Sequence, residues 1–377
     1  MIDSLHIKGF RCFENMSLEG FSIINIVTGS NASGKSALLE AIYLGTNASA
    51  HAVQNIAVMR GLPTAIAAAN PMMSFFPFMI AAQPQAGLST YFDHLFRSAS
   101  TDGRIESAKT IEISFANKGQ GASELKIFYQ TEGTEPAPVS RTPNQAAAPP
   151  VIFARKTPTE IQPQPVTITL SPLGQLQQQP PTSKPLGPTT LIFGTQTNYA
   201  EIDNITWFSQ LRVRNESDKV VSFIRREFPF VKDMETLAPS GSNGLFAIMT
   251  DGTRRPITTV SSGIYKIISI LLATAHTRNG VIIIDEVENG IFYAKYAAIW
   301  RILYQFAKDT GNQIFVSSHS KECLQALPEV MGDNAQDFCL IRTERADEEC
   351  KARCVTGTAM SAALAGGNEV RGLGDGH

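Results

Sequence analysis

The sequence lacks any marked excess of charge of one sign. Its 377 residues carry 32 Lys and Arg against 34 Asp and Glu, a formal net charge of −2, and the isoelectric point is near 6.3. A nearly neutral chain has no overall attraction to nucleic acid or to an anionic membrane surface, so any DNA contact must come from a local patch. With 43% hydrophobic residues, the chain can bury one large core or two joined cores.

Cysteine is scarce and shows no framework of pairs. The five cysteines are Cys12, Cys323, Cys339, Cys350 and Cys354. The opening MIDSLHIKGF is too polar for an export signal, so we expect reduced thiols and a cytoplasmic protein. No second pair with zinc-like spacing accompanies Cys350 and Cys354, and we prefer free surface thiols to a metal site there.

Charge is also absent from the segment between Gly61 and Phe92. Four prolines interrupt it, whereas a membrane-spanning helix needs about 20 apolar residues with an unbroken backbone ladder. We therefore expect no membrane association. We interpret the segment as covering an interface with a second subunit or an effector, through Met72, Phe75, Phe76, Phe78 and Met79. The alternative is that it belongs to the core.

Hydrophobic patterns indicate an α/β fold. Apolar runs predict strands in SLHIKGF and FSIINIVTG near the amino terminus, and in Val281–Asp285 and Gln313–Ser318 further on. The last two flank a helical segment, AKYAAIWRILYQFAKDTG, which predicts parallel strands joined by a helix. Apolar residues that alternate with polar ones between about 104 and 130 predict an antiparallel hairpin. We expect a mostly parallel sheet with helices on both faces, plus an antiparallel β subdomain.

Composition suggests three parts. Residues 1–197 form a first lobe, in which the stretch of about 132–190 is rich in Pro, Gln, Thr and Ala. We expect this stretch to be an extended surface insertion without a packed core, containing one possible strand at Val166–Leu170. Residues 198–345 form a second lobe and residues 346–377 a C-terminal tail. We find no internal repeat and no heptad run, which excludes a long coiled coil.

The segment Gly29–Ser36 fits the phosphate-binding pattern G-x-x-x-x-G-K-[ST], directly after an apolar strand and directly before a helix. Glycines let backbone N–H groups surround phosphate oxygens, Lys35 reaches the outer phosphates, and Ser36 ligates Mg²⁺. The alternative is a plain glycine-rich turn. The residues expected to contact ATP are Gly29, Asn31, Ser33, Gly34, Lys35, Ser36 and Ala37.

Two acids follow the apolar run at 281–284. Asp285 and Glu286 stand at the carboxyl end of a predicted strand, where ligands bind in open α/β sheets. We expect Asp285 to hold Mg²⁺ through water and Glu286 to activate the attacking water as a general base. An exposed acidic turn is the alternative.

The stretch VIIIDEVENGI, followed by a helix and by QIFVSSHS, resembles AAA-family ATPases with ABC/SMC/RecF-like heads, a group related to the OLD-type and phage-defence ATPases. KGFRCF and NASGKSALLEAI resemble the start of such heads. The resemblance implies that Glu288, Asn289 and Gly290 form a dimer-facing loop, the D-loop. It also implies that His319 senses the γ-phosphate, although a structural histidine is the alternative.

In TVSSGIY, Ser262 and Gly263 stand at the position of the ABC signature, which contacts the phosphate bound by the partner head. The full Leu-Ser-Gly-Gly-Gln form is absent, so these serines could be only a helix N-cap. The Q-loop of such heads has no clear counterpart in this sequence.

The resemblance implies a homodimer, or a higher oligomer, that closes around two Mg-ATP and hydrolyses them. It further implies a sensor or regulator in phage defence or DNA maintenance that acts with a separate effector protein. Two rivals remain: a RecF-like DNA repair clamp, and a slow ATP-switched scaffold without useful turnover. A transporter subunit is the interpretation we favour least.

Overall fold

The computed structural model describes residues 1–62, 88–101, 104–107, 110–119, 121–130, 149–171, 176–181, 184–194, 201–239, 241, 243–368 and 370. Most of the uncharged segment between Gly61 and Phe92 lies outside these residues. Its expected role at an interface therefore stays a prediction.

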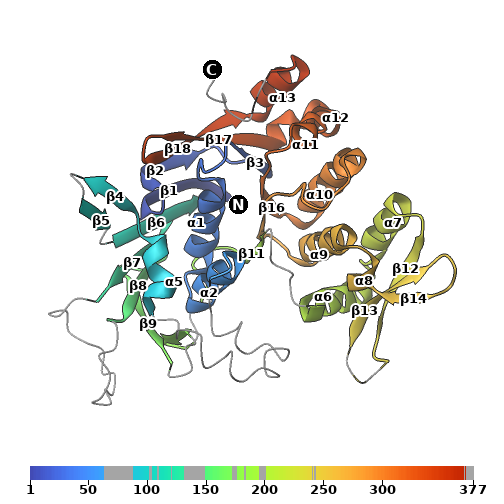
Figure 1. Ribbon diagram of the computed structural model, residues 1–377, viewed down its shortest axis with the longest axis horizontal. Helices are drawn as coiled ribbons and strands as arrows, with labels where there is room; N and C mark the ends of the chain where they lie inside the picture. Colours follow the sequence, from blue (N-terminus) through green and yellow to red (C-terminus); the bar gives the residue numbers. More distant parts are fainter. Residues whose placement is uncertain are drawn as a thin grey trace.

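A six-stranded sheet forms the centre of the described structure (Figure 1). Its strands, in spatial order, are β11 (Thr190–Phe193), β15 (Val281–Ile284), β16 (Gln313–Ser317), β3 (Ile24–Thr28), β17 (Phe338–Ala346) and β18 (Glu349–Thr356). Neighbouring strands run parallel from β11 to β17, and only β18 is antiparallel. The sheet brings β3, from the start of the chain, next to two strands from its last third.

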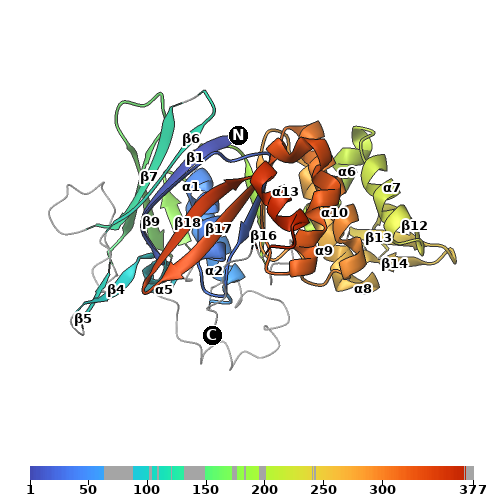
Figure 2. The same cartoon turned by 90° about the horizontal axis from the view of Figure 1, so that it is seen from above.

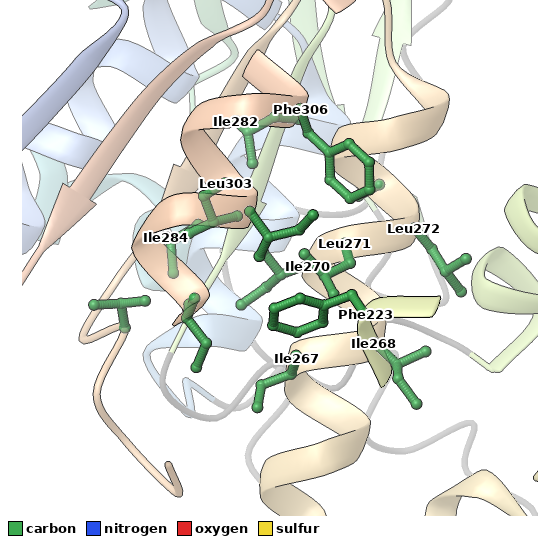
Figure 3. Packing of buried hydrophobic residues seen from close by; sticks show 14 of the residues in the cluster. Phe223, Ile267, Ile268, Ile270, Leu271, Leu272, Ile282, Ile284, Leu303 and Phe306 are labelled. Carbon is green, nitrogen blue, oxygen red and sulfur yellow. The ribbon is translucent and has the colours of Figure 1, made fainter. Parts of the chain in front are cut away.

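Helices cover both faces of this sheet, as the continuous apolar runs predict. Along β15, Ile282 and Ile284 belong to one hydrophobic core and Val281 and Ile283 to the other. The first core contains α6 (Glu201–Val213), α7 (Asp218–Glu227), α9 (Ser262–His276) and α10 (Tyr296–Thr310), and the second contains α1 (Lys35–Asn47) and α2 (Ala50–Met59). Figure 3 shows α9 and α10 packing against β15 in the first core.

A second sheet, of seven antiparallel strands, lies on the far side of α1 (Figure 2). Its spatial order is β10 (Leu176–Gln179), β9 (Gln164–Leu170), β8 (Val151–Lys156), β7 (Ala122–Tyr129), β6 (Thr110–Asn117), β1 (Ile2–Phe10) and β2 (Phe13–Glu19). The predicted hairpin is β6 and β7. The amino-terminal strand β1 pairs here with β2 and β6 and takes no part in the central sheet.

The expectation of an unpacked insertion at about 132–190 is wrong for the described part of that stretch. It supplies β8, β9 and β10, and Val151, Phe153, Val166 and Ile168 are buried in the core. Alternating apolar residues in VIFARK and PVTITL gain a partner strand on each side, and this pairing outweighs the proline-rich composition around them.

The expected boundaries also differ from the structure. Residue 346 falls within the antiparallel pair of β17 and β18, so the expected C-terminal tail contributes an edge strand to the central sheet. The two expected lobes share that sheet as well, because β3 and β11 of the first lobe pair with strands of the second.

The remaining elements lie around these layers. They are α5 (Leu88–Phe92), η2 (Asp93–Leu95), β4 (Ser98–Thr101), β5 (Arg104–Ser107), β12 (Val231–Leu237), β13 (Gly244–Met249), β14 (Arg254–Pro256), α8 (Ile257–Val260), η3 (Tyr293–Lys295), α11 (Lys321–Gln325), α12 (Leu327–Met331), η4 (Gly332–Asp337) and α13 (Gly357–Ala365). Among the helices described, none has the length and hydropathy needed to cross a membrane.

Candidate nucleotide site

The predicted phosphate loop lies between β3 and α1, in the strand–loop–helix order that the sequence indicates. Its last glycine, Gly34, is the N-cap of α1 and has a φ of 96°. A Cβ atom at this position would lie 2.9 Å from Cys12 Sγ. Both the left-handed backbone and the sulfur contact therefore require glycine here.

Lys35, the first residue of α1, folds back over this loop. Its ammonium group donates to the carbonyl oxygens of Gly29 and Ser30, at 2.9 and 2.8 Å. Burial lowers the pKa of Lys35, and three nearby carboxylates oppose that shift: those of Asp285, Glu286 and Glu288. The tertiary structure thus brings the predicted phosphate-binding cation close to the predicted catalytic acids, about 250 positions later in the chain.

Thr343 on β17 anchors the phosphate loop to the strand next to β3, a contact that the sequence analysis missed. Ser33 lies 2.6 Å from Thr343, hydroxyl to hydroxyl, and Thr343 donates to the carbonyl oxygen of Thr28 at 3.0 Å. A Cβ atom on Gly29 would lie 2.3 Å from the Thr343 carbonyl oxygen, so Gly29 permits this close approach. Ser33, predicted as a nucleotide contact, is fully buried beneath the loop.

Asp285 and Glu286 stand at the carboxyl end of β15, beside the end of β16. One buried hydroxyl joins them: Ser317 Oγ donates to the Asp285 carboxylate and accepts from the Glu286 backbone N–H at 2.8 Å. The Glu286 carboxylate accepts a hydrogen bond from the Asn289 side chain. Ser317, also missed, precedes the expected histidine by two positions, and the pairing of β16 with β15 is what brings it to the acids.

Glu288 points into the protein and holds the segment that contains His319. Its Oε1 atom accepts from the backbone N–H groups of His319 and Ser320, at 2.8 and 3.1 Å. The Nδ1 atom of His319 lies 3.1 Å from the same oxygen, and the imidazole side chain is 50% exposed. Glu288 therefore orients the predicted γ-phosphate sensor, while its own side chain is buried and 6% exposed.

Ser262 and Gly263 form the start of α9. Ser262 is exposed, whereas Gly263 is buried against the loop that follows Glu286. The N-cap residue is Ser261, and its side chain makes no capping hydrogen bond. Ser262 is thus exposed at a helix N-terminus, and its expected contact with the phosphate of a second subunit stays a prediction.

Two arginines flank Glu40, a buried carboxylate on α1. Arg11 Nη2 lies 2.8 Å from one Glu40 oxygen and Arg60 Nε 2.6 Å from the other. Burial acts to lower the pKa of Arg60, but the Glu40 carboxylate, with a smaller contribution from Asp285, raises it above its ordinary value. Arg11 is the arginine of the KGFRCF turn, and Arg60 adds a cation near Asp285 that the sequence analysis missed.

The five cysteines are free thiols, as predicted. The expected surface position is wrong for Cys350, which is buried, and Cys354 is half-buried. Four of them form two hydrogen-bonded pairs. The bond to Cys350, together with burial, raises the pKa of the Cys12 thiol, and the bond to Cys354, together with burial, raises that of Cys339. Within the described residues, no three His, Cys, Asp or Glu side chains are placed to hold a metal ion.

Two known families match the chain, one at each part of the site. The family described as "AAA domain" matches residues 4–60, which include the phosphate loop, and the family described as "AAA ATPase domain" matches residues 190–324, which include the acids and His319. Both parts of the candidate site therefore lie in regions that match AAA-type ATPase families.

Two proteins are similar to the chain in sequence. An ATP/GTP phosphatase of Helicobacter pylori (strain ATCC 700392 / 26695) is 23% identical over 354 residues, which cover 90% of each chain. A DNA replication and repair protein RecF of Idiomarina loihiensis is 51% identical over 43 residues, 11% of this chain and 12% of the relative.

Solved structures similar to the chain include the SMC head domain from Thermotoga maritima. Its TM-score is 0.40 at 12% sequence identity, and the match covers 94% of this chain and 98% of that one. An SMC head bound to the C-winged helix domain of ScpA has a TM-score of 0.44 with 15% identity, and covers 94% of this chain and 98% of its own.

The side chains at this site fit Mg-ATP. Mg²⁺ prefers oxygen ligands and is commonly held by one or two carboxylates together with the substrate phosphates, so a cluster of three acids is not required. Asp285 would supply a carboxylate, and Ser36, one residue after Lys35, would supply a hydroxyl. When bound, the ion would neutralise charge on the phosphate oxygens.

Proposed function

We propose that this chain binds and hydrolyses ATP in a Mg²⁺-dependent reaction, with Glu286 as the general base. The observation that carries this proposal is the shared hydroxyl of Ser317, which holds Asp285 and Glu286 together at the end of β15. Lys35 lies within electrostatic reach of both acids. The ATP/GTP phosphatase similar to the chain over 90% of its length supports hydrolysis, and also makes GTP a substrate to test.

In this mechanism each residue has one task. Lys35 and the backbone N–H groups of the loop bind the outer phosphates, and Mg²⁺ would be held by Ser36 directly and by Asp285 through water. Glu286 takes a proton from the attacking water, and His319, oriented by Glu288, donates to the γ-phosphate. Positioning and charge stabilisation supply most of the rate enhancement in phosphoryl transfer.

The test is phosphate release from ATP and from GTP, with and without Mg²⁺. Glu286→Gln preserves the shape of the side chain but removes the base, so it should retain ATP binding and lose activity by roughly 100-fold or more. Glu329→Gln, which changes an exposed carboxylate on α12, is the matched control. If Glu286→Gln turns over ATP at the wild-type rate, another group activates the water. If the wild-type protein binds ATP without turnover, the ATP-switched scaffold becomes the better description.

The proposed assembly is a homodimer in which Ser262 and Gly263 of one head face the nucleotide on the other. Exposure of Ser262 at the start of α9 supports it. The proposed role is a sensor or regulator in phage defence or DNA maintenance that acts with a separate effector protein. The family resemblance supports this role, and the short stretch of identity to RecF favours DNA maintenance.

DNA binding separates the proposed roles. Fluorescence anisotropy with labelled duplex, measured with and without ATP at several salt concentrations, reports the number of phosphate contacts through the slope of affinity against salt. ATP-dependent binding with a steep slope would support a RecF-like clamp. Absence of binding would favour a regulator that acts through another protein.

A further inference from the structure

The first turn of α9 packs directly against the loop that carries the catalytic acids. A Cβ atom on Gly263 would lie 1.9 Å from the carbonyl oxygen of Gly290, so the two backbones touch. The next turns of α9 are fixed in the hydrophobic core, where Ile267, Ile268 and Leu271 are buried (Figure 3). The helix is therefore a rigid support for the loop that follows β15.

Lys266 makes the polar contact between this helix and the loop. Its Nζ atom donates to the carbonyl oxygen of Glu286 at 2.7 Å and lies 3.4 Å from that of Asn289. Burial lowers the pKa of Lys266, while the carboxylates of Glu288, Glu286 and Asp285 oppose that shift. In the proposed mechanism, this half-buried cation beside three acids neither binds phosphate nor activates water.

The backbone of Glu286 needs such support. Its φ of 49° lies in the left-handed region, which non-glycine residues adopt at a cost unless their surroundings hold them there. Two side chains from different elements hold the backbone of this residue: Ser317 of β16 accepts from its N–H, and Lys266 of α9 donates to its C=O. The direction in which the Glu286 carboxylate points depends on both.

We propose that Lys266 is a positioning residue for ATP hydrolysis, which fixes the backbone of Glu286 and thereby couples the start of α9 to the general base. This inference rests on the proposed function, in which Glu286 activates water. Because Ser262 lies one turn before Lys266 on the same helix, a phosphate that contacts Ser262 from a second subunit acts on the element that holds Glu286. The signature segment would then influence hydrolysis in its own subunit as well as in its partner.

Steady-state kinetics of Lys266→Met test this role. Methionine keeps most of the volume but cannot donate, so kcat should fall by about tenfold while KM and ATP affinity stay within about twofold of wild type. Lys266→Arg retains charge and donors in a different geometry, and should have an intermediate kcat. Lys308→Met, which removes a hydrogen-bonded but exposed lysine on α10, should leave kcat unchanged.

A double mutant distinguishes positioning from general damage. If Lys266 acts through Glu286, adding Lys266→Met to Glu286→Gln should cause no further loss in single-turnover hydrolysis, because the group being positioned is already gone. A merely structural role would lower the residual rate again. If Lys266→Met does not fold, Lys266→Arg decides alone: an intermediate kcat with unchanged KM supports the inference.

Three other outcomes would overturn the inference that Lys266 positions Glu286. Wild-type kcat in both Lys266 variants, a rise in KM without loss of kcat, or additive losses in the double mutant would each show that Lys266 does not position Glu286. If Glu286→Gln is inactive but Lys266→Met is fully active, only this inference fails. If Glu286→Gln itself keeps wild-type activity, the proposed role of Glu286 as general base fails, and this inference fails with it.

Discussion

The hydroxyl of Thr343 lies 2.6 Å from that of Ser33, although the two residues are 310 positions apart in the chain. Both side chains are buried, and Thr343 also donates to the carbonyl oxygen of Thr28. A chain of hydroxyls thus fixes the phosphate loop to β17, the neighbour of β3 in the central sheet. The loop is anchored by the strand beneath it as well as by the elements on either side of it in sequence.

Thr343→Val should therefore loosen this loop. Valine has nearly the same shape, but it leaves the Ser33 hydroxyl and the Thr28 carbonyl without this partner, which costs about 1–3 kcal/mol in a buried site. We expect a lower denaturation midpoint and weaker ATP binding by isothermal titration. Thr343→Ser, which keeps the hydroxyl, should recover most of both. Equal stability of the valine variant and the wild type would show that the hydroxyl contacts are not needed.

Lys35→Ala should abolish most ATP binding. The ammonium group of Lys35 is the side-chain cation of the phosphate loop, and loss of a charge-assisted contact to phosphate lowers affinity by roughly 100-fold. Lys219→Ala, at an exposed lysine that pairs with Asp309, is the control. Fluorescent ATP-analogue binding measures both. Unchanged affinity in Lys35→Ala would mean that the loop does not hold phosphate.

Ser317→Ala should impair hydrolysis more than binding. It removes the hydroxyl that orients both acids, leaving the Glu286 N–H without that acceptor, and we expect kcat to fall by about tenfold or more with little change in ATP affinity. The adjacent Ser318→Ala is a matched control, because Ser318 Oγ contacts the Ser320 backbone instead. Equal losses in the two variants would indicate general damage to β16.

A mixed dimer tests whether the two heads share their sites. Lys35→Ala cannot hold phosphate, and Ser262→Arg places a bulky side chain where a small hydroxyl should approach it, so each should be nearly inactive alone. In a mixed dimer, one site unites the intact Lys35 of one variant with the intact Ser262 of the other. Mixing should restore part of the ATPase activity.

This experiment needs two controls. The first is proof that subunits exchange, and the second is activity in dimers of one wild-type and one variant subunit, in which only one site is intact. If both hold and the mixture stays inert, Ser262 does not complete the partner's site. The start of α9 would then serve only the contacts that it makes within its own chain.

The local motifs were readable from the sequence because each is a contiguous stretch with its own chemistry. The apolar run Ile24–Thr28, the loop Gly29–Gly34 and the helix from Lys35 follow one another, so their order and the position of the loop need no knowledge of distant residues. The same holds for β15 and the acids at its carboxyl end. Buried parallel strands require apolar side chains on both faces, and that requirement is visible in single segments.

Tertiary structure alone decided the contacts that hold these motifs in place. Thr343, Ser317 and Lys266 act across separations of 310, 31 and 20 positions, and none of them stands in a pattern that names its partner. Strand pairing likewise turned the proline-rich stretch around β8 and β9 into part of a packed sheet, because side chains on a strand are stabilised chiefly by their cross-strand neighbours. Which strands lie side by side depends on the whole chain, because the strand pairings together must bury both hydrophobic cores.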